Sequence, residues 1–475
     1  MSDSPCILWF RRDLRLSDNP ALRAAADSGR PIVPVFLWTP DDEGRWAPGG
    51  AARAFAHQTL KTLAADLEAV GLGLVVRRGE GAEALLPALC AEVGAEAVYY
   101  NERYEPAAKR AEARAVGELE SRGVVVEGFQ GSVLFDADEV HTKGGEPYKV
   151  FTPFAKAARA LEARRSPSPA PERGRLRPPA RWPAGLGIDD LGLMPEHPWG
   201  RKVASHWPIG ETAARRRMHR FCGEGIFEYK RLRDRPDLDA TSRLSPHLHW
   251  GAVSAHQVWE AGLEALEAAE TEDGRKGCQA FLNEVLWREF SYHLLRHFPR
   301  TPDENLRSNF DAFPWTWGGE ALERWRGGRT GYPIVDAAMR QLWETGWMHN
   351  RLRMIAGSLL TKDLLVHWLE GARWFWDTLV DADLANNTQG WQWTAGCGAD
   401  AQPFFRIFNP TTQAKRFDPE GDFVRKWVPE LAGLEGGAIH EPWEAGMFVD
   451  YPEPIVDHKA ARDRALAAFE EVKGG

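Results

Sequence analysis

The chain has 475 residues, more than one compact domain usually holds, so two or three domains are expected. Hydrophobic residues make up 43% of it and charged residues 27%, as in soluble globular proteins, and no run of about 18 apolar residues suggests a membrane span. The formal net charge of −9 argues against indiscriminate binding of nucleic acid, although it does not exclude a basic patch on one face.

The cysteines indicate a reducing environment. They are odd in number, scattered and never spaced as C-x-x-C: Cys6, Cys90, Cys222, Cys278 and Cys397. This pattern predicts neither a disulfide framework nor a zinc site, and it favours a cytoplasmic location. The first residues place charges directly after a short apolar segment, unlike a signal peptide.

The first 131 residues alternate short apolar runs with helical periodicity. Strands are predicted at 6–10, 32–38, 72–76, 97–100 and 124–127, with helices at 21–26, 51–70, 82–93 and 107–121. Alternation of this kind predicts an α/β domain with a doubly wound parallel sheet. No G-x-G-x-x-G follows the first strand, so the usual dinucleotide fingerprint is missing.

Residues 132–200 interrupt this alternation. They include a run rich in Pro and Arg at 164–183, which favours extended backbone, and a solvated linker is a better interpretation than a DNA-binding arm. Residues 201–475 are predicted to form an all-helical domain. Helices are expected at 211–221, 255–269, 278–297, 319–326, 334–343, 351–360 and 363–380.

Tryptophan is concentrated in this second part. Of the 21 tryptophans, only Trp9, Trp38 and Trp46 precede residue 182. The stretch 381–410 combines two acids, an amide pair, two tryptophans and an arginine within an aromatic run. Burying an unsatisfied polar group costs roughly 2–7 kcal/mol, so these groups need partners. The partners could be backbone groups at a helix end, or a polar aromatic cofactor.

Two further stretches are ambiguous alone. Thr241, Ser242 and Ser245 gather hydroxyls ahead of a helix, as in a phosphate-binding loop, although a helix cap would look similar. Glu284 and Arg288 are spaced i, i+4 and could simply form an ion pair on a helix.

Taken together, seven motifs resemble the photolyase/cryptochrome family over essentially the whole chain. They are W-F-R-R-D-L-R-L-S-D-N-P (9–20), T-S-R-L-S-P (241–246), W-R-E-F (287–290), T-G-Y-P-I-V-D-A-A-M-R-Q-L (330–342), G-W-M-H-N-R-L-R-M (346–354), W-Q-W (391–393) and F-F-R-I-F-N-P (404–410). Within the family, the chain is most similar to class I bacterial photolyases that act on cyclobutane pyrimidine dimers (CPD).

The resemblance implies FAD, reduced in the active form, in the helical domain. The matching cofactor-binding positions are Tyr229, Thr241, Ser242, Arg243, Leu244, Ser245, Phe281, Glu284, Arg288, Trp347, Asn350, Arg353, Asp381, Asp383 and Asn387. Asn387 matches the position that faces flavin N5. A neutral amide there cannot supply a proton, which favours an enzyme over a photoreceptor.

The resemblance also implies UV-damaged DNA, single- or double-stranded, as the substrate. Trp287 and Trp393 match the aromatic walls around the flipped dimer, and Glu284 matches the carboxyl group at its base edges. Asn350 and Met354 would complete the pocket, with Met354 favouring CPD over (6-4) photoproducts. The phosphate contacts would be Arg351 and Arg406, with Lys415 and Arg416 either extending them or forming a solvated surface pair.

Trp391, Trp368 and Trp315 match the family's electron-transfer chain, although core packing is the usual role of any one tryptophan. The expected function is a light-driven, monomeric DNA repair lyase. A non-repairing cryptochrome and a (6-4) photolyase are the alternatives, and a flavin oxidoreductase is disfavoured by the missing nicotinamide fingerprint. Pro106-Ala107-Ala108 replaces the family's folate contact, so an antenna chromophore (a deazaflavin or a folate) stays unassigned.

Overall fold

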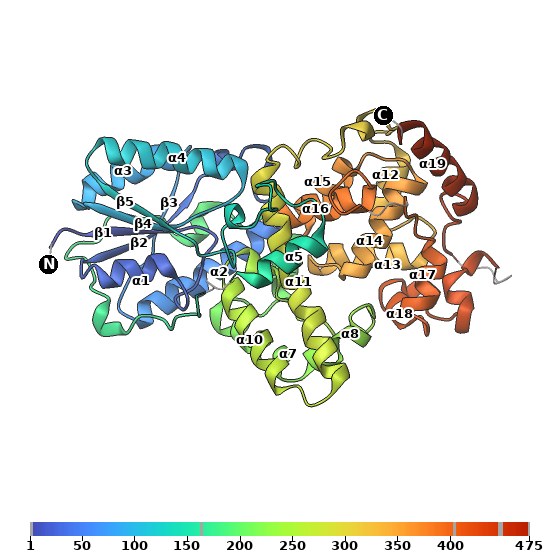
Figure 1. Ribbon diagram of the computed structural model, residues 1–475, viewed down its shortest axis with the longest axis horizontal. Coiled ribbons are helices and arrows are strands. Elements are labelled where there is room, and N and C mark those ends of the chain that lie inside the picture. Colours follow the sequence, from blue (N-terminus) through green and yellow to red (C-terminus); the bar gives the residue numbers. More distant parts are fainter. Residues whose placement is uncertain (1–2, 162–164, 402–404, 445–449, 474–475) are drawn as a thin grey trace.

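The computed structural model of the chain describes residues 3–161, 165–401, 405–444 and 450–473. An α/β part lies at one end of an elongated molecule and a helical part makes up the rest, with α19 (His458–Val472) at the far end (Figure 1). None of the helices in these ranges combines the length and hydrophobicity that a bilayer crossing requires.

The α/β part contains one parallel sheet in the order β3-β2-β1-β4-β5. Its strands are β1 (Cys6–Phe10), β2 (Ile32–Trp38), β3 (Val75–Arg78), β4 (Ala97–Asn101) and β5 (Val125–Phe129). Side chains alternate along β1, so Leu8 packs in the core with α1 (Pro20–Asp27) and α2 (Gly50–Ala69), while Ile7 packs with the helices on the other face. These are α3 (Ala82–Val93) and α4 (Pro106–Ser121), which lie above the sheet in Figure 1. The predicted doubly wound parallel sheet is confirmed.

The predicted linker is partly helical. It contains α5 (Phe151–Ala160), and Phe154 packs against Phe290 of the helical part with ring centroids 5.0 Å apart. Two hydrogen bonds attach this part of the chain to the sheet: Ile32 N donates to Arg177 O in the Pro- and Arg-rich segment, and Leu186 N, just after it, donates to Val76 O. Tertiary hydrogen bonds that composition does not reveal therefore order this segment.

The helical part has no strand among its described residues. Its helices are α6 (Trp199–Ser205), α7 (Glu211–Gly223), α8 (Tyr229–Leu232), α9 (Ser245–His249), α10 (Ala255–Ala268), α11 (Glu272–His297), α12 (Glu320–Arg326), α13 (Pro333–Thr345), α14 (Asn350–Ser358), α15 (Trp368–Thr378), α16 (Leu384–Ala395), α17 (Pro410–Phe417), α18 (Asp422–Trp427) and α19. One core joins α5, α7, α10 and α11, and another joins α12 to α19.

The predicted helix 363–380 begins too early. In the structure the chain makes a π-helical turn at Leu359–Asp363, and Leu365 has a left-handed φ of 55° that cannot continue a helix. α15 begins only at Trp368, after the His367 side chain accepts a hydrogen bond from Leu369 N. A cap provided by histidine is not a common sequence signal, which explains the error.

Candidate active site

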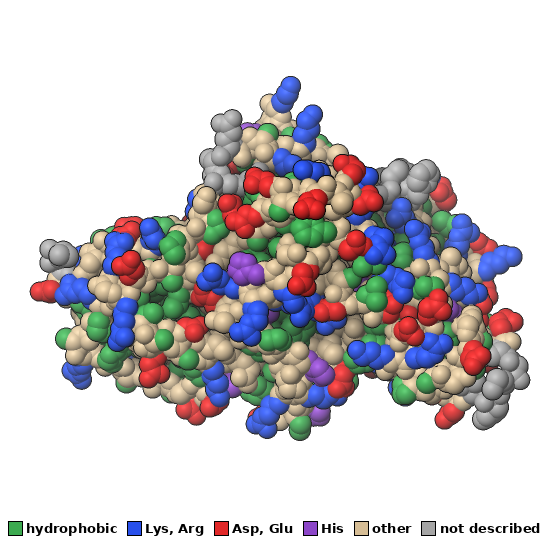
Figure 2. Space-filling model, turned by 90° about the horizontal axis from the view of Figure 1, so that it is seen from below, with side chains coloured by type: hydrophobic (Ala, Val, Ile, Leu, Met, Phe, Trp, Pro, Cys, Tyr) green, Lys and Arg blue, Asp and Glu red, His purple; other side chains and the backbone are tan. Residues whose placement is uncertain are grey.

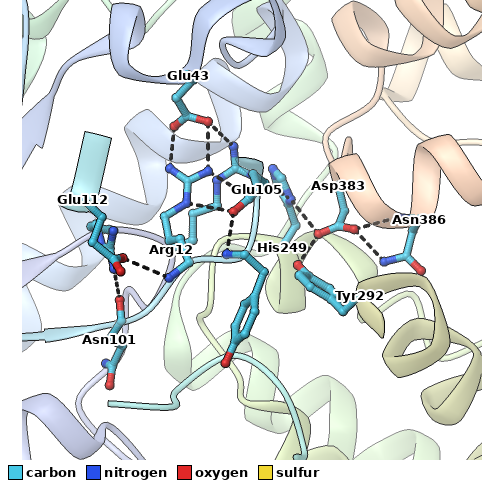
Figure 3. Close-up of polar contacts among 12 residues, drawn as sticks. Arg12, Glu43, Asn101, Glu105, Glu112, His249, Tyr292, Asp383 and Asn386 are labelled. Atoms are coloured by element: carbon cyan, nitrogen blue, oxygen red, sulfur yellow. Dashed lines mark hydrogen bonds and ion pairs between the residues drawn. The ribbon is translucent and has the colours of Figure 1, made fainter. Parts of the chain in front are cut away.

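Asp383 forms the polar centre of the candidate site. It is the N-cap of α16, and its Oδ1 accepts hydrogen bonds from Asn386 N at 2.9 Å and Asn386 Nδ2 at 2.7 Å. Its Oδ2 accepts from the Tyr292 hydroxyl of α11 and lies 3.9 Å from His249 Nδ1 (Figure 3). Burial would raise the pKa of Asp383, but His249, Arg288 and Tyr292 outweigh burial and lower it. Asp383 is therefore a fixed anion at neutral pH.

A buried charge network connects Asp383 with the α/β part (Figure 3). Arg103 binds Glu43 at 2.6 and 2.9 Å, and it binds Glu105 at 2.9 and 3.1 Å. Arg12 contacts both carboxylates and lies 3.5 Å from His249 Nδ1. Burial would raise the pKa of Glu105, but the positive charges of Arg103 and Arg12 outweigh this effect and lower the pKa. The network fixes the position of His249 beside Asp383.

Arg353 and Asp381 form a second fixed pair near the start of α16. Arg353 Nη2 lies 3.0 and 2.8 Å from the two Asp381 oxygens, and Arg353 Nε donates to Met348 O at 2.8 Å. Asp381 is 7% exposed, so a charged guanidinium beside it is needed to offset its burial.

The loop 241–245 is built around arginines. Arg217 donates to Ser242 O at 2.8 Å and to Thr241 O at 2.9 Å, which holds the loop backbone. Arg243 has a left-handed φ of 49° and lies over the Trp347 ring, 4.8 Å from its centroid. A non-glycine residue in this conformation is strained, as is often seen at binding sites. The loop therefore brings together Arg243 and Trp347, which the resemblance assigned to the cofactor.

The residues present fit FAD. His349 and His249 are 2% and 5% exposed, and the Nε2 atom of each lacks a hydrogen-bond partner among the described residues. His349 adjoins Trp347, and His249 adjoins Asp383. Buried polar atoms normally have partners. Both nitrogens lie beside residues predicted to bind the cofactor. A polar ligand bound there would supply the missing hydrogen-bond partners.

Asn387 and Trp391 are one helical turn apart on α16, and both contact α15. Asn387 Nδ2 donates to Ala372 O at 3.1 Å. Trp391 lies on Gly371, where an added Cβ would overlap the indole ring. Trp391 and Trp368 are buried, whereas Trp315 is only partly buried and contacts His367, which also contacts Trp368. Trp315 is therefore nearer the surface than Trp391 and Trp368, which both lie in the core.

Glu284 and Trp287, the predicted substrate contacts, both have partners that the sequence does not reveal. Glu284 Oε1 lies 2.6 Å from Arg233 Nη1. Trp287 is stacked on Phe151, with centroids 3.7 Å apart and planes within 6°, so one face of the indole is covered. Arg288 pairs with Glu289 rather than with Glu284, so the i, i+4 ion pair is not formed.

The predicted phosphate contacts meet at one surface cavity of about 410 Å³. It is lined by Asp234, Arg351, Arg406, Phe408, Gln413, Arg416 and Phe417. Lys415 instead pairs with Glu441 at 2.5 Å. Basic and acidic side chains are intermixed over the face shown in Figure 2. Local groups of arginines, rather than the overall charge, would therefore attract DNA.

The remaining predicted residues lie around these groups. Tyr229 and Phe281 are buried and edge-to-face, with centroids 5.8 Å apart, next to the buried Leu244. Ser245 opens α9, and Asn350 and Met354 lie on α14. Trp393 lines a small cavity with Lys362, Phe405 and Arg406. Phe404 of the last motif lies outside the described residues.

Two cavities border the α/β part. One, of about 50 Å³, lies at the carboxyl ends of β1 and β2, where parallel sheets usually bind ligands. The other, of about 320 Å³, is lined by Ala107 and Ala108 together with Trp46 and Trp376. Ala107 and Ala108 belong to the segment that replaces the folate contact, and the antenna chromophore stays a prediction.

The comparisons with known proteins agree with this geometry. A family model for DNA photolyase matches residues 6–172, and a model for the FAD binding domain of DNA photolyase matches residues 281–471. A deoxyribodipyrimidine photo-lyase of Agrobacterium fabrum is 42% identical over 100% of this chain and 99% of its own. Cryptochrome-2 of Arabidopsis thaliana is 35% identical over 99% of this chain and 79% of its own.

A solved structure is similar along the full length. The crystal structure of a bacterial class III photolyase from Agrobacterium tumefaciens has a TM-score of 0.93 at 42% identity, covering 100% of this chain and 99% of that one. The predicted resemblance and the FAD-binding domain are confirmed, while the placement in class I stays a prediction. Fold, site geometry and similarity agree: the chain belongs to the DNA photolyase family.

Proposed function

We propose that the protein is a light-driven lyase that splits cyclobutane pyrimidine dimers in UV-damaged DNA. The observation that carries the proposal is the arrangement of α16. This helix presents Asn387 and Trp391 to consecutive residues of α15, and its N-cap is the buried anion Asp383. When bound, reduced FAD supplies the photoexcited electron donor of this reaction. The cytoplasmic location and the monomeric state stay predictions.

The cofactor would be held by groups from both sides of the site. Asp383 and the Arg353–Asp381 pair would fix its polar edges, and the loop 241–245 would lie at its phosphates. Asn387 has a neutral amide, so it could hold the flavin ring by a hydrogen bond without supplying a proton. Gly371 lets Trp391 lie close to α15 and begin the path to Trp368 and Trp315.

The substrate would be bound by an acidic, an aromatic and two basic side chains. Glu284 would turn from Arg233 to the base edges of the flipped dimer, and the face of Trp287 away from Phe151 would stack on one base. Arg351 and Arg406 would neutralise flanking phosphates at the 410 Å³ cavity, which predicts salt-dependent affinity.

Repair of an oligonucleotide with a single thymine dimer tests the proposal. The FAD-loaded protein should restore the two thymines under near-UV or blue light and leave the dimer intact in darkness. The Glu284→Ala, Trp393→Ala double variant should lose most activity while keeping its flavin. Repair of a (6-4) photoproduct, without repair of the cyclobutane dimer, would contradict the proposed substrate.

A non-repairing photoreceptor is the second candidate, because a plant cryptochrome is 35% identical over 99% of the chain. It predicts photoreduction of FAD without any dimer splitting. The same assay therefore separates the two functions.

A further inference from the structure

Two adjacent residues after α8 hold the two charged groups expected to meet the substrate. Arg233 pairs with Glu284 of α11 at 2.6 Å, and Asp234 pairs with Arg351 of α14 at 2.9 Å. The pairs have opposite polarity, and they connect α8 to the two helices that carry the predicted lesion contacts. Neither Arg233 nor Asp234 belonged to the predicted site.

Asp234 fixes the orientation of the Arg351 guanidinium. Its Oδ1 accepts from Arg351 Nη2 at 2.9 Å and lies 3.3 Å from Nε, so it occupies one edge of the group. The opposite nitrogen, Nη1, lies 3.8 Å from the sulfur of Met354, and the guanidinium carbon Cζ lies 4.7 Å from the ring centroid of Phe417. The donor nearest to the lesion residue Met354 is therefore Nη1.

Among the residues that the structure describes, Asp234 is the one acid lining a cavity in which three arginines meet. Its side chain is 36% exposed, against 19% for Arg351, so it meets approaching DNA with a negative charge. A phosphate that needs the Nε and Nη2 edge of Arg351 must displace this carboxylate. A phosphate beside a base flipped against Met354 can use Nη1 and leave the carboxylate in place.

We propose that Asp234 is a specificity-determining residue that withholds Arg351 from undamaged DNA and directs it to the phosphate next to a flipped lesion. The inference rests on the proposed repair function and adds that Asp234 weakens binding to undamaged DNA. Asp234 touches neither the dimer nor the flavin. It acts through Arg351 and is a positioning residue.

Binding of the Asp234→Asn holoprotein in darkness tests this role. Affinities are measured over a range of salt for one undamaged duplex and for the same duplex with one cyclobutane dimer. The variant should bind the undamaged duplex roughly fivefold more tightly, with a salt slope steeper by about 0.9, since one more guanidinium becomes free to neutralise a phosphate. Affinity for the damaged duplex should change by less than about twofold, so the preference for damage falls.

The matched control is Glu228→Gln, which removes the same charge from an exposed carboxylate that pairs with Arg231. It should leave both affinities unchanged, and Asp234→Glu should restore the preference. Equal tightening on both duplexes, weaker binding to both, or an effect no larger than that of Glu228→Gln would overturn the proposal. If the wild type binds damaged and undamaged duplexes equally, the proposed repair function is overturned instead. The wild-type measurement alone shows this, without the variants.

Discussion

At the scale of single residues, His247 illustrates how burial sets charge. It lies at 2% exposure in α9, edge-on to Phe55 of α2 with centroids 5.6 Å apart. Burial, followed by the positive charge of Arg217, lowers its pKa to about 4. The side chain is therefore neutral in the folded protein at pH values where an unfolded histidine, with a pKa near 6.5, begins to bind a proton.

Acidification should therefore destabilise the fold through His247. Between pH 7.5 and 5.5 the unfolded chain takes up a proton and the folded chain does not, so unfolding becomes easier by about 1.3 kcal/mol for this residue. The loss begins as pH falls through about 6.5 and ends near pH 4. Urea unfolding of His247→Gln at the two pH values should show a pH effect smaller by that amount. An unchanged effect would mean that His247 is protonated in the fold.

The site was predicted unevenly at this scale. The structure brings Arg243 to Trp347 and Arg353 to Asp381, and the resemblance had assigned all four to the cofactor. Arg233, Asp234 and Phe151 were missed. Charges around 229–236 are visible in the sequence, but their partners depend on how the residues after α8 lie relative to α11 and α14. Phe151 lies in a segment expected to be an extended linker.

At the scale of elements, the sheet was predicted better than the helical bundle. β1, β2 and α3 have the predicted bounds, since apolar runs closed by charges or turn residues fix both ends. α11 begins six residues earlier than predicted, with Thr271 accepting from Gly274 N as its cap. α15 begins later, because the left-handed Leu365 interrupts the periodic pattern.

The contact between α15 and α16 depends on Gly371. A Cβ there would overlap the Trp391 ring, so Gly371→Ala should push the indole away from α15. Overpacking of this kind costs about 1–3 kcal/mol, more than the helix gains from alanine. Photoreduction of bound FAD should slow toward the rate of Trp391→Phe.

Gly390→Ala provides the control for this change. Gly390 lies on α16 with open space at its Cβ position, so alanine should leave photoreduction unchanged and stability equal or slightly higher. Equal rates of FAD photoreduction in Gly371→Ala and the wild type would contradict a role of Trp391 in electron transfer.

At the scale of the whole molecule, polar contacts join the α/β part to the helical part. Trp376 Nε1 donates to Ala47 O at 2.7 Å, and Gly50 N donates to Asp377 at the same distance. Buried Arg15 donates to Gly251 O at 3.0 Å and to Gly131 O at 2.8 Å. The charge network of Arg12, Glu43, Arg103 and Glu105 lies beside these contacts and leads to His249.

Removal of one charge from this network should weaken the whole fold. Glu105→Gln leaves Arg12 and Arg103 short of a buried anion, and breaking such a pair costs about 3–5 kcal/mol. Glu118→Gln, at an exposed pair with Arg122, should cost less than about 1 kcal/mol. Thermal unfolding of the two holoproteins makes the comparison, and equal losses would show that the buried network adds no stability.

The measurement that tests the central claim most directly is the splitting of a single cyclobutane thymine dimer, followed by chromatography, in light and in darkness. Restored thymines should be found only in the illuminated sample with FAD-loaded protein, and almost none with the Glu284→Ala, Trp393→Ala variant. An intact dimer after illumination of a wild-type protein that photoreduces its FAD normally would contradict repair and favour a photoreceptor.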